Sequence, residues 1–293
     1  MYAASITPID EKGNPDLKAI PEYVAFLANR GCHGSLILGT TGEGTSFSPE
    51  ERVAIWEAAV SVRDTYPAFR LFAGTGTPSL TETISLNRAA FDLGFDAVVV
   101  LPPFYYRNVG DEGLFDWYAQ IIESSVPEGK HLLGYHIPAL SGVSLSLDLL
   151  KRLNSFDEHK FAGLKDSSGD REHAHMLVAN LDSKLILVGH DKLFADALKA
   201  GASGCITALA NLESPSLRAI WDAHERGEIN IDVQNSVNEA RSVLDSQPPA
   251  PSFLKAMLHE LHNFPKWSVR APLLALDEDQ IQISLAALQS HQN

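Results

Sequence analysis

Eight short apolar segments recur along the first three quarters of this chain, and longer segments of mixed polarity separate them. Short runs of this kind are typical of buried β-strands, whereas the longer segments repeat their apolar residues at helical spacing. Strands that alternate with helices predict a parallel sheet, because each crossover helix returns the chain to the same end of the sheet. We expect strands at residues 4–7, 35–39, 70–73, 97–101, 132–135, 161–165, 185–188 and 204–207.

The segments between these strands carry helix start signals. At residues 48–51, Ser48 is placed as an N-cap, Pro49 occupies the first helical position and Glu51 completes a capping box. A glycine follows several of the segments, where a left-handed helix cap favours it. We expect helices at residues 16–29, 49–64, 80–93, 112–124, 147–153, 171–181 and 192–200.

Eight strands predict an α/β fold in which the parallel strands close into a (β/α)8 barrel, the TIM barrel. A doubly wound sheet is the alternative, but it usually carries a glycine-rich nucleotide turn. The sequence Gly-Thr-Gly at residues 74–76 is followed by Thr-Pro and does not complete that fingerprint. Beyond residue 212 the sequence predicts helices only. We therefore expect a barrel at residues 1–222 and a helical extension, packed on it, at residues 223–293.

Charge and composition narrow the classes of partner. The chain has 293 residues and a formal net charge of −14, whereas nucleic acids and anionic membranes favour a basic surface. We expect neither of them as a partner. The two cysteines, Cys32 and Cys205, match no metal or redox spacing. Because no secretory signal pattern and no apolar stretch of membrane-spanning length is visible, the sequence predicts a cytoplasmic protein.

The segment Phe-Ala-Gly-Leu-Lys-Asp-Ser-Ser-Gly-Asp at residues 161–170 is the strongest chemical signal. Its apolar run ends in Lys165, and barrel enzymes place their chemistry at the carboxyl ends of the strands. Lysine is rarely buried. Burial disfavours an ammonium group and so frees an amine, which condenses with ketones to form a Schiff base. The alternative is a lysine that leaves the strand for solvent beside Asp166.

Polar residues also follow other predicted strands at the same end of the barrel. The sequence Gly-Thr-Thr-Gly-Glu at residues 39–43 offers hydroxyl and backbone N–H groups that suit a carboxylate, although an ordinary turn has the same composition. Tyr105 and Tyr135 lie at two further strand ends, where a tyrosine either transfers protons or packs. The sequence Gly-His-Asp-Lys at residues 189–192 ends the seventh strand.

Together these segments resemble the dihydrodipicolinate synthase and N-acetylneuraminate lyase family, which are class I, pyruvate-dependent aldolases. The resemblance extends from Ser-Ile-Thr-Pro at residues 5–8 to Val-Arg-Ala-Pro-Leu at residues 269–273. It rests on residues 39–43, on Tyr-x-x-Pro at residues 135–138 and on residues 163–170. The family implies a small-molecule 2-oxo acid and an aldehyde as substrates, and a homo-oligomer, by resemblance a tetramer.

The resemblance also implies a role for each matching residue. Lys165 forms the Schiff base with pyruvate or another 2-oxo acid, and Tyr135 acts as acid and base. Thr40 connects Tyr135 to a tyrosine from a neighbouring subunit, for which Tyr105 is the best match and Tyr106 the adjacent alternative. The residues that match substrate-binding positions are Thr41, Gly189 and Ile206.

One departure from the family pattern concerns Leu140. Members that condense pyruvate with aspartate semialdehyde carry an arginine at this position, which pairs with the second carboxylate of the substrate. Leucine cannot supply a charge-assisted, bidentate contact. The sequence therefore disfavours 4-hydroxy-tetrahydrodipicolinate synthase, which stays as the alternative function.

The segment at residues 137–142 instead resembles the sialic acid lyase branch, and Ser167 and Asp191 match that branch as well. Lys192, however, stands where the branch has an acidic residue. This reversal of charge favours an anionic or differently hydroxylated aldehyde, unless Lys192 points away and pairs with Asp191 or Asp196. We predict an aldolase or lyase that acts on a 2-oxo acid and leave its aldehyde partner open.

Other classes of protein fit less well. A barrel that binds a 2-oxo acid without turnover has no need of the set Lys165, Tyr135, Thr40 and Thr41. A pyridoxal phosphate enzyme needs a phosphate cradle near the last strands, and residues 204–208 supply none. His173 and His175 lie on a predicted helix, where residues two apart point to different faces. We therefore expect no cofactor and no metal.

Overall fold

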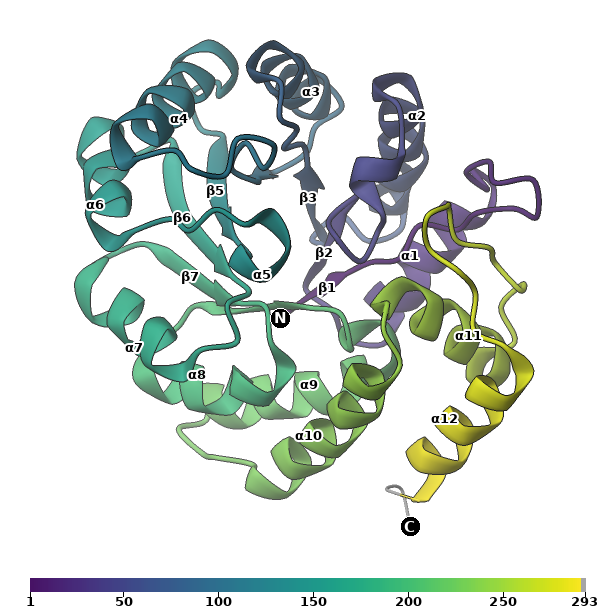
Figure 1. Ribbon diagram of the computed structural model, residues 1–293. Helices are drawn as coiled ribbons and strands as arrows, with labels where there is room; N and C mark the ends of the chain where they lie inside the picture. The colour runs from purple at the N-terminus through teal and green to yellow at the C-terminus, as the bar shows by residue number, and fades with distance from the viewer. Residues whose placement is uncertain (291–293) are drawn as a thin grey trace.

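Eight parallel strands form a closed barrel at the centre of the computed structural model, which describes residues 1–290 (Figure 1). Each strand pairs with the next one along the chain, and the last pairs with the first. This confirms the predicted fold. The strands are β1 (Tyr2–Ala4), β2 (Gly34–Ile37), β3 (Arg70–Gly74), β4 (Ala97–Val100), β5 (His131–His136), β6 (Phe161–Asp166), β7 (Leu185–Val188) and β8 (Gly204–Thr207).

Helices surround the barrel as an outer ring (Figure 1). A 3-10 turn follows β2 (η1, Gly44–Ser46), another follows the second helix (η2, Ser61–Asp64) and a third follows β7 (η3, Asp191–Leu193). The helices are α1 (Ala19–Asn29), α2 (Pro49–Val60), α3 (Leu80–Asp92), α4 (Asp111–Ser125), α5 (Pro138–Ser141), α6 (Leu147–Phe156), α7 (Arg171–Asn180), α8 (Phe194–Ala200), α9 (Ala210–Glu225), α10 (Ile231–Ser246), α11 (Ala250–His262) and α12 (Glu278–Ser290).

The alternation of side chains along each strand divides the core into two layers. Leu36, Phe72, Val99, Leu133 and Tyr135 belong to the cluster that fills the barrel interior. A larger cluster fills the layer between the sheet and the helices. Because successive side chains point to opposite faces, each strand end presents one residue to the barrel interior and the next to the helices.

The strand limits differ from the prediction mainly at β1, which ends at Ala4 instead of beginning there. The Ser5 hydroxyl donates to the Leu36 carbonyl and the Thr7 hydroxyl to that of Gly42, so these residues bond to the rim of the barrel. β2 ends before Leu38, whose φ of 60° breaks the extended conformation. The short helix α5 was not predicted.

The chain beyond the barrel is helical, as predicted. The expected boundary after residue 222 falls inside α9, and the division of the chain into barrel and extension stays a prediction. In Figure 1, α10, α11 and α12 lie outside the barrel at the lower right, on the side of α1 and α9. In the described part of the chain, no helix is both long and apolar enough to cross a membrane.

Candidate active site

Lys165 and Tyr135 lie side by side because β5 and β6 pair in register at these residues. Both side chains are almost fully buried, with 3% of each residue exposed. The Lys165 Nζ donates a hydrogen bond to the Tyr135 hydroxyl at 3.1 Å. It also lies 4.2 Å from the centre of the phenol ring. A lysine that is buried and hydrogen-bonded in this way does not leave its strand for solvent.

Thr40 extends this contact toward solvent. Its hydroxyl lies 3.1 Å from the Tyr135 hydroxyl, so one hydrogen-bonded chain joins Thr40, Tyr135 and Lys165. Burial raises the pKa of the Tyr135 phenol, but the charge of Lys165 and hydrogen bonds with Thr40, Lys165 and Ser167 outweigh it and hold the pKa below its ordinary value. The phenol is therefore suited to pass a proton between a buried amine and a group nearer the surface.

The turn that carries Thr40 and Thr41 has an unusual backbone. Glu43 has a φ of 56°, its N–H donates to the Thr40 carbonyl at 3.0 Å, and Thr41 is buried. A side chain at Gly44 has no room, because a Cβ there would lie 2.0 Å from the Leu38 carbonyl oxygen. The Gly-Thr-Thr-Gly-Glu sequence thus folds into a tight turn that sets the position of both threonines.

A buried ion pair fixes this turn to the C-terminal helices. The Lys255 Nζ on α11 lies 2.6 Å from a Glu43 carboxylate oxygen, and both side chains are 1% exposed. Lys255 also donates to the Ser268 carbonyl, and the backbone N–H of Arg270 donates to the second Glu43 oxygen at 2.8 Å. Burial lowers the pKa of Lys255 to about 8, although the Glu43 carboxylate opposes this shift. The position of Lys255 in this turn was not predicted from the sequence.

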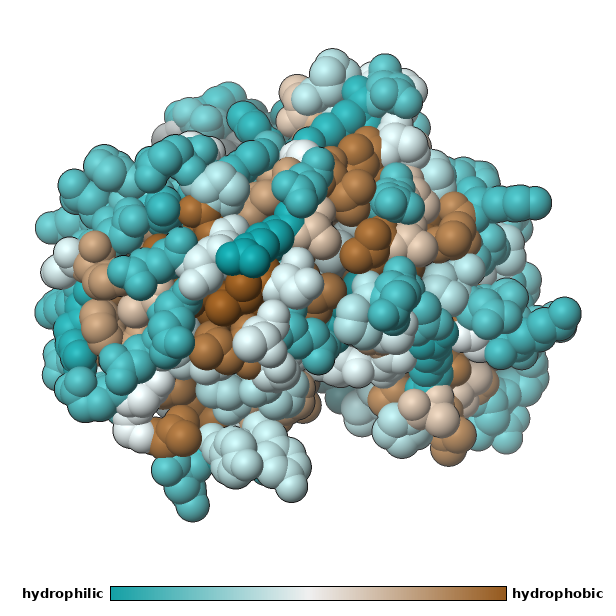
Figure 2. Space-filling view, turned by 90° about the horizontal axis from the view of Figure 1, so that it is seen from above, coloured by the Kyte–Doolittle hydropathy of each residue, from teal (hydrophilic) through white to brown (hydrophobic). Residues whose placement is uncertain are grey.

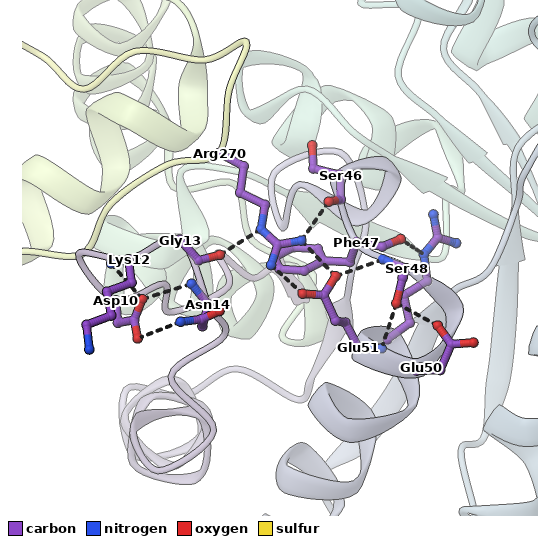
Figure 3. A network of polar contacts seen from close by, with 11 residues as sticks. Asp10, Lys12, Gly13, Asn14, Ser46, Phe47, Ser48, Glu50, Glu51 and Arg270 are labelled. Carbon is purple, nitrogen blue, oxygen red and sulfur yellow. Dashed lines mark hydrogen bonds and ion pairs between the residues drawn. The ribbon is translucent and has the colours of Figure 1, made fainter.

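Arg270 makes a second contact between the two ends of the chain (Figure 3). Its guanidinium donates to Glu51 at the start of α2 and to the backbone carbonyls of Gly13 and Ser46. Glu51 also accepts from the backbone N–H of Ser48, which forms the predicted capping box. The segment after α11 therefore holds the middle and the end of the loop that joins β2 to α2, through Glu43 and Ser46.

A cavity of about 200 Å³ opens beside Thr40 and Tyr135. Its walls come from the ends of β2 to β5 and from α2 and α5, and they are mostly apolar. Leu140 lines it and is 62% exposed, so the position that carries arginine in the synthases is apolar here. The remaining lining residues are Leu36, Leu38, Gly39, Gly44, Thr45, Arg52, Gly74, Gly76, Val99, Leu101, Phe104, Ile137 and Ser141.

The sequence model of the Dihydrodipicolinate synthetase family matches residues 1–291. The chain belongs to this family. It is 37% identical over 290 residues to an uncharacterized DapA-like lyase of Chloroflexus aurantiacus, covering 98% of this chain and 95% of that protein. It is 31% identical over 262 residues to an N-acetylneuraminate lyase of Lactiplantibacillus plantarum, covering 88% of this chain and 87% of the relative.

Solved structures of this family share the fold. A chloride-inhibited dihydrodipicolinate synthase of Acinetobacter baumannii, solved in complex with pyruvate, superimposes with a TM-score of 0.90 at 27% identity. The match covers 99% of this chain and 98% of that one. The protein is therefore a carbon–carbon lyase of the class I aldolase type, as the sequence predicted.

Three further residues that the family resemblance pointed to do not line the cavity. Ile206 belongs to the same interior cluster as Tyr135. Ser167 lies directly against Gly189 and helps to lower the pKa of Tyr135. A Cβ at position 189 would lie 1.9 Å from the Ser167 hydroxyl oxygen, so no other residue fits there without displacing Ser167.

Asp191 and Lys192 lie at an internal contact between η3 and α10. Asp191 is fully buried, and its carboxylate pairs with Arg241 of α10 at 2.7 Å. Lys192 pairs with Asp245 of the same helix at 3.4 Å, not with Asp191 or Asp196. Neither residue lines the cavity. The partners Arg241 and Asp245 were not predicted, because no local pattern indicates that α10 packs on the turn after β7.

Tyr105 and Tyr106 point away from the rest of the chain, with exposed fractions of 75% and 72%. Their rings contact each other edge to face at 5.2 Å. Within one copy, Thr40 is hydrogen-bonded to Tyr135, and among the described residues no hydrogen bond joins it to Tyr105. Two adjacent aromatic side chains that are this exposed are unusual on a surface that contacts only solvent.

A second polar cluster lies behind Lys165 and Tyr135, on the outer face of the same two strands. His136 follows Tyr135 and Asp166 follows Lys165, so strand alternation places both beside α7, where His173 joins them. The ligand atoms of these three residues lie within 4.8 Å of one another, a spacing that could hold a metal ion. His173 bonds to Asp166 at 3.2 Å, which raises the pKa of its imidazole. This set of three residues was not predicted from the sequence.

Proposed function

We propose that this protein makes or breaks a carbon–carbon bond between pyruvate and an aldehyde through a Schiff base on Lys165. The observation that carries the proposal is the hydrogen-bonded chain from Thr40 through Tyr135 to Lys165 at the carboxyl end of the barrel. Barrel enzymes place their reacting groups at this end. The N-acetylneuraminate lyase and the pyruvate-bound synthase among its relatives support the same chemistry.

In this mechanism the Lys165 amine attacks the ketone carbon of the 2-oxo acid, and loss of water leaves an iminium ion. The positive nitrogen withdraws electrons, so that a bond to the neighbouring carbon forms or breaks through an enamine. Tyr135 supplies and removes the protons of these steps, since its hydroxyl contacts the amine directly. Thr40 and Thr41 hold the substrate carboxylate with their hydroxyl and backbone N–H groups, and Gly189 and Ile206 face the pyruvyl group.

Tyr135→Phe is expected to slow turnover by about a hundred- to ten-thousandfold, the usual contribution of a general acid–base group. The ring keeps its packing in the barrel interior, so pyruvate capture on Lys165 should change far less than turnover. Steady-state kinetics, together with the yield of borohydride-trapped adduct, measures both effects. Near-normal turnover in the variant would show that the tyrosine only packs.

We also propose that the enzyme is a cytoplasmic homo-oligomer, by family resemblance a tetramer, in which Tyr105 of a neighbouring copy meets Thr40. The exposure of Tyr105 and Tyr106 supports an interface. Figure 2 shows the face above α2, α3 and α4, where hydrophobic residues gather in patches between hydrophilic ones. Closed symmetric assemblies are the usual form of such oligomers.

Tyr105→Phe should therefore lower kcat without changing the oligomeric state, because it removes one hydroxyl from the proton path and keeps the ring. The matched control is Tyr106→Phe, which should leave kcat within about twofold if Tyr105 alone completes the site. Sedimentation measures the assembly. A fully active monomer, or the larger loss with Tyr106→Phe, removes Tyr105 from the proposed catalytic set.

A panel of 2-oxo acids, assayed for release of pyruvate, tests the function. It includes N-acetylneuraminate and 2-keto-3-deoxy sugar acids, with pyruvate plus aspartate semialdehyde assayed in the synthetic direction. Leu140 cannot pair with the carboxylate of aspartate semialdehyde. We therefore expect the enzyme to release pyruvate from a 2-oxo acid of the panel faster than it condenses pyruvate with aspartate semialdehyde. Efficient synthase activity would favour the alternative function, 4-hydroxy-tetrahydrodipicolinate synthase. Pyruvate capture without turnover of any member would indicate a binding protein.

A further inference from the structure

Arg107 lies at the rim of the cavity, on the loop that joins β4 to α4. This loop leaves the carboxyl end of β4, the end where barrel enzymes place their chemistry. The Arg107 stem packs against Gly142, since a Cβ at position 142 would lie 2.6 Å from the Arg107 Cδ and 2.9 Å from its Nε. The Nε also donates to the Phe104 carbonyl, at 3.5 Å. The guanidinium therefore lies between two parts of the cavity wall, which are Phe104 and the α5 residues Leu140 and Ser141.

The Arg107 guanidinium has almost no partner inside the protein. Its side chain is exposed, and the 3.5 Å contact with Phe104 is at the limit of a hydrogen bond. Among the residues that the structure describes, Arg107 forms no ion pair. By contrast, three other cations at the same end of the barrel are paired with carboxylates, namely Lys192 with Asp245, Arg241 with Asp191 and Arg270 with Glu51. An unpaired arginine is ordinary on a surface, so its place at the cavity rim is what distinguishes Arg107.

The proposed assembly leaves one side of the cavity to the aldehyde. Tyr105 of a neighbouring copy meets Thr40 in that assembly, so the room beside Thr40 is filled. The wall formed by Phe104, Leu140 and Ser141 stays accessible, and Leu140 is 62% exposed. We expect the part of an aldehyde that extends away from the Schiff base to pass along this wall toward the rim.

The wall and the rim differ in charge. Leu140 leaves the wall without a charge, whereas Arg107 places a guanidinium beyond it, and guanidinium groups bind carboxylates and phosphates through two parallel hydrogen bonds. Because the chain has a formal net charge of −14, attraction of an anionic substrate depends on a local cation of this kind. An anionic group close to the aldehyde carbon meets Leu140, and only a group at the far end of a longer aldehyde reaches Arg107.

We propose that Arg107 recognises an anionic group, a carboxylate or a phosphate, at the far end of an extended aldehyde substrate. The assignment rests on the proposed function and makes Arg107 a specificity-determining residue. It agrees with the low activity expected for aspartate semialdehyde, whose carboxylate lies too near the aldehyde carbon to pass Leu140 and reach the rim.

The test compares defined aldehydes that differ in charge, each condensed with pyruvate. For a carboxylate the pair is 5-oxopentanoate and its methyl ester, and for a phosphate it is D-erythrose 4-phosphate and D-erythrose. The wild-type enzyme is expected to favour the anionic member of at least one pair by about fivefold or more in kcat/KM. Arg107→Met should lower kcat/KM for that anion by about five- to thirtyfold, and for its neutral counterpart by less than about twofold, because charge-assisted bonds are partly screened at an exposed rim.

Two variants control this measurement. Arg107→Lys keeps the positive charge and should retain part of the preference. Arg226→Met removes an exposed arginine that follows α9, at the opposite end of the barrel, and should leave the preference unchanged. The borohydride adduct of pyruvate on Lys165 shows that each variant is folded, and sedimentation checks its assembly because Arg107 shares a loop with Tyr105. Absence of the adduct in the wild type rejects the proposed function itself, whereas an adduct without preference for anions rejects only the role of Arg107.

A binding measurement covers an enzyme that accepts none of these aldehydes. The wild-type enzyme with pyruvate reduced onto Lys165 is titrated by ligand-observed NMR with D-erythritol 4-phosphate and erythritol, and with pentanoate and pentanamide. Tighter binding of the anion in either pair, lost in Arg107→Met, supports the proposal. Equal binding within both pairs, or a preference for anions that persists in Arg107→Met, overturns it. A variant that dissociates and loses charged and neutral aldehydes equally also overturns it, and assigns Arg107 to the contact between copies.

Discussion

Incubation with pyruvate and borohydride is expected to add one reduced pyruvyl group to each chain, on Lys165. This lysine is buried, lies at the carboxyl end of β6 and contacts a tyrosine whose pKa is held low. Among residues 1–290, no other lysine combines these features with a place at the carboxyl end of the barrel strands. Peptide mass spectrometry after digestion locates the adduct.

Lys165→Arg is the matched control, because it keeps the positive charge but lacks a nucleophilic amine. It should form no adduct and lose activity on the order of 10⁵-fold or more, as in other enzymes that lose a covalent nucleophile. Adduct formation on a different lysine, or persistence of the adduct in Lys165→Arg, would contradict the Schiff-base mechanism. Lys255 is the most useful lysine for comparison, because it is also buried but its ammonium group is paired with Glu43.

The second large effect concerns the ion pair between Glu43 and Lys255. Lys255→Met should lower the free energy of unfolding by about 3–5 kcal/mol, because it leaves the Glu43 carboxylate buried without its charged partner. Urea unfolding followed by circular dichroism measures the change. Activity should fall as well, since Glu43 fixes the turn that carries Thr40.

A double variant separates the charge from the packing. Glu43→Gln combined with Lys255→Met removes both charges and should recover much of the lost stability, because no buried charge remains unpaired. The exposed pair of Arg226 and Glu228 provides the comparison, and Arg226→Met should cost at most about 1 kcal/mol. A Lys255→Met protein as stable as Arg226→Met would show that the buried pair contributes little.

The barrel was predictable because its signals are local. Each strand is a short apolar run and each crossover a helical pattern, so the order of elements determines the architecture. The first strand was misplaced because Ser5 and Thr7 look like strand residues locally. Their hydroxyl groups bond to Leu36 and Gly42, more than 30 residues away, and no local pattern reports such contacts.

The candidate site was predictable to the extent that it depends on strand ends. Lys165, Tyr135 and Thr40 all follow from that rule, and the structure brings them into one hydrogen-bonded chain. Lys255 was missed because it lies inside a helix, where lysine is an ordinary surface residue. Only its burial, which depends on how the helices pack, distinguishes it from other lysines.

The bond between Lys255 and Glu43 joins residues 212 positions apart, and Arg270 reaches Glu43 across 227 positions. During synthesis, all eight strands leave the ribosome before either partner exists, since the last strand ends at Thr207. The nascent barrel therefore carries Lys165 and both threonines while the Glu43 carboxylate still lacks its counter-charge. We therefore expect the proposed active site to mature only when the final fifth of the chain has emerged, because an incomplete polypeptide lacks the contacts that fix the turn of Thr40 and Thr41.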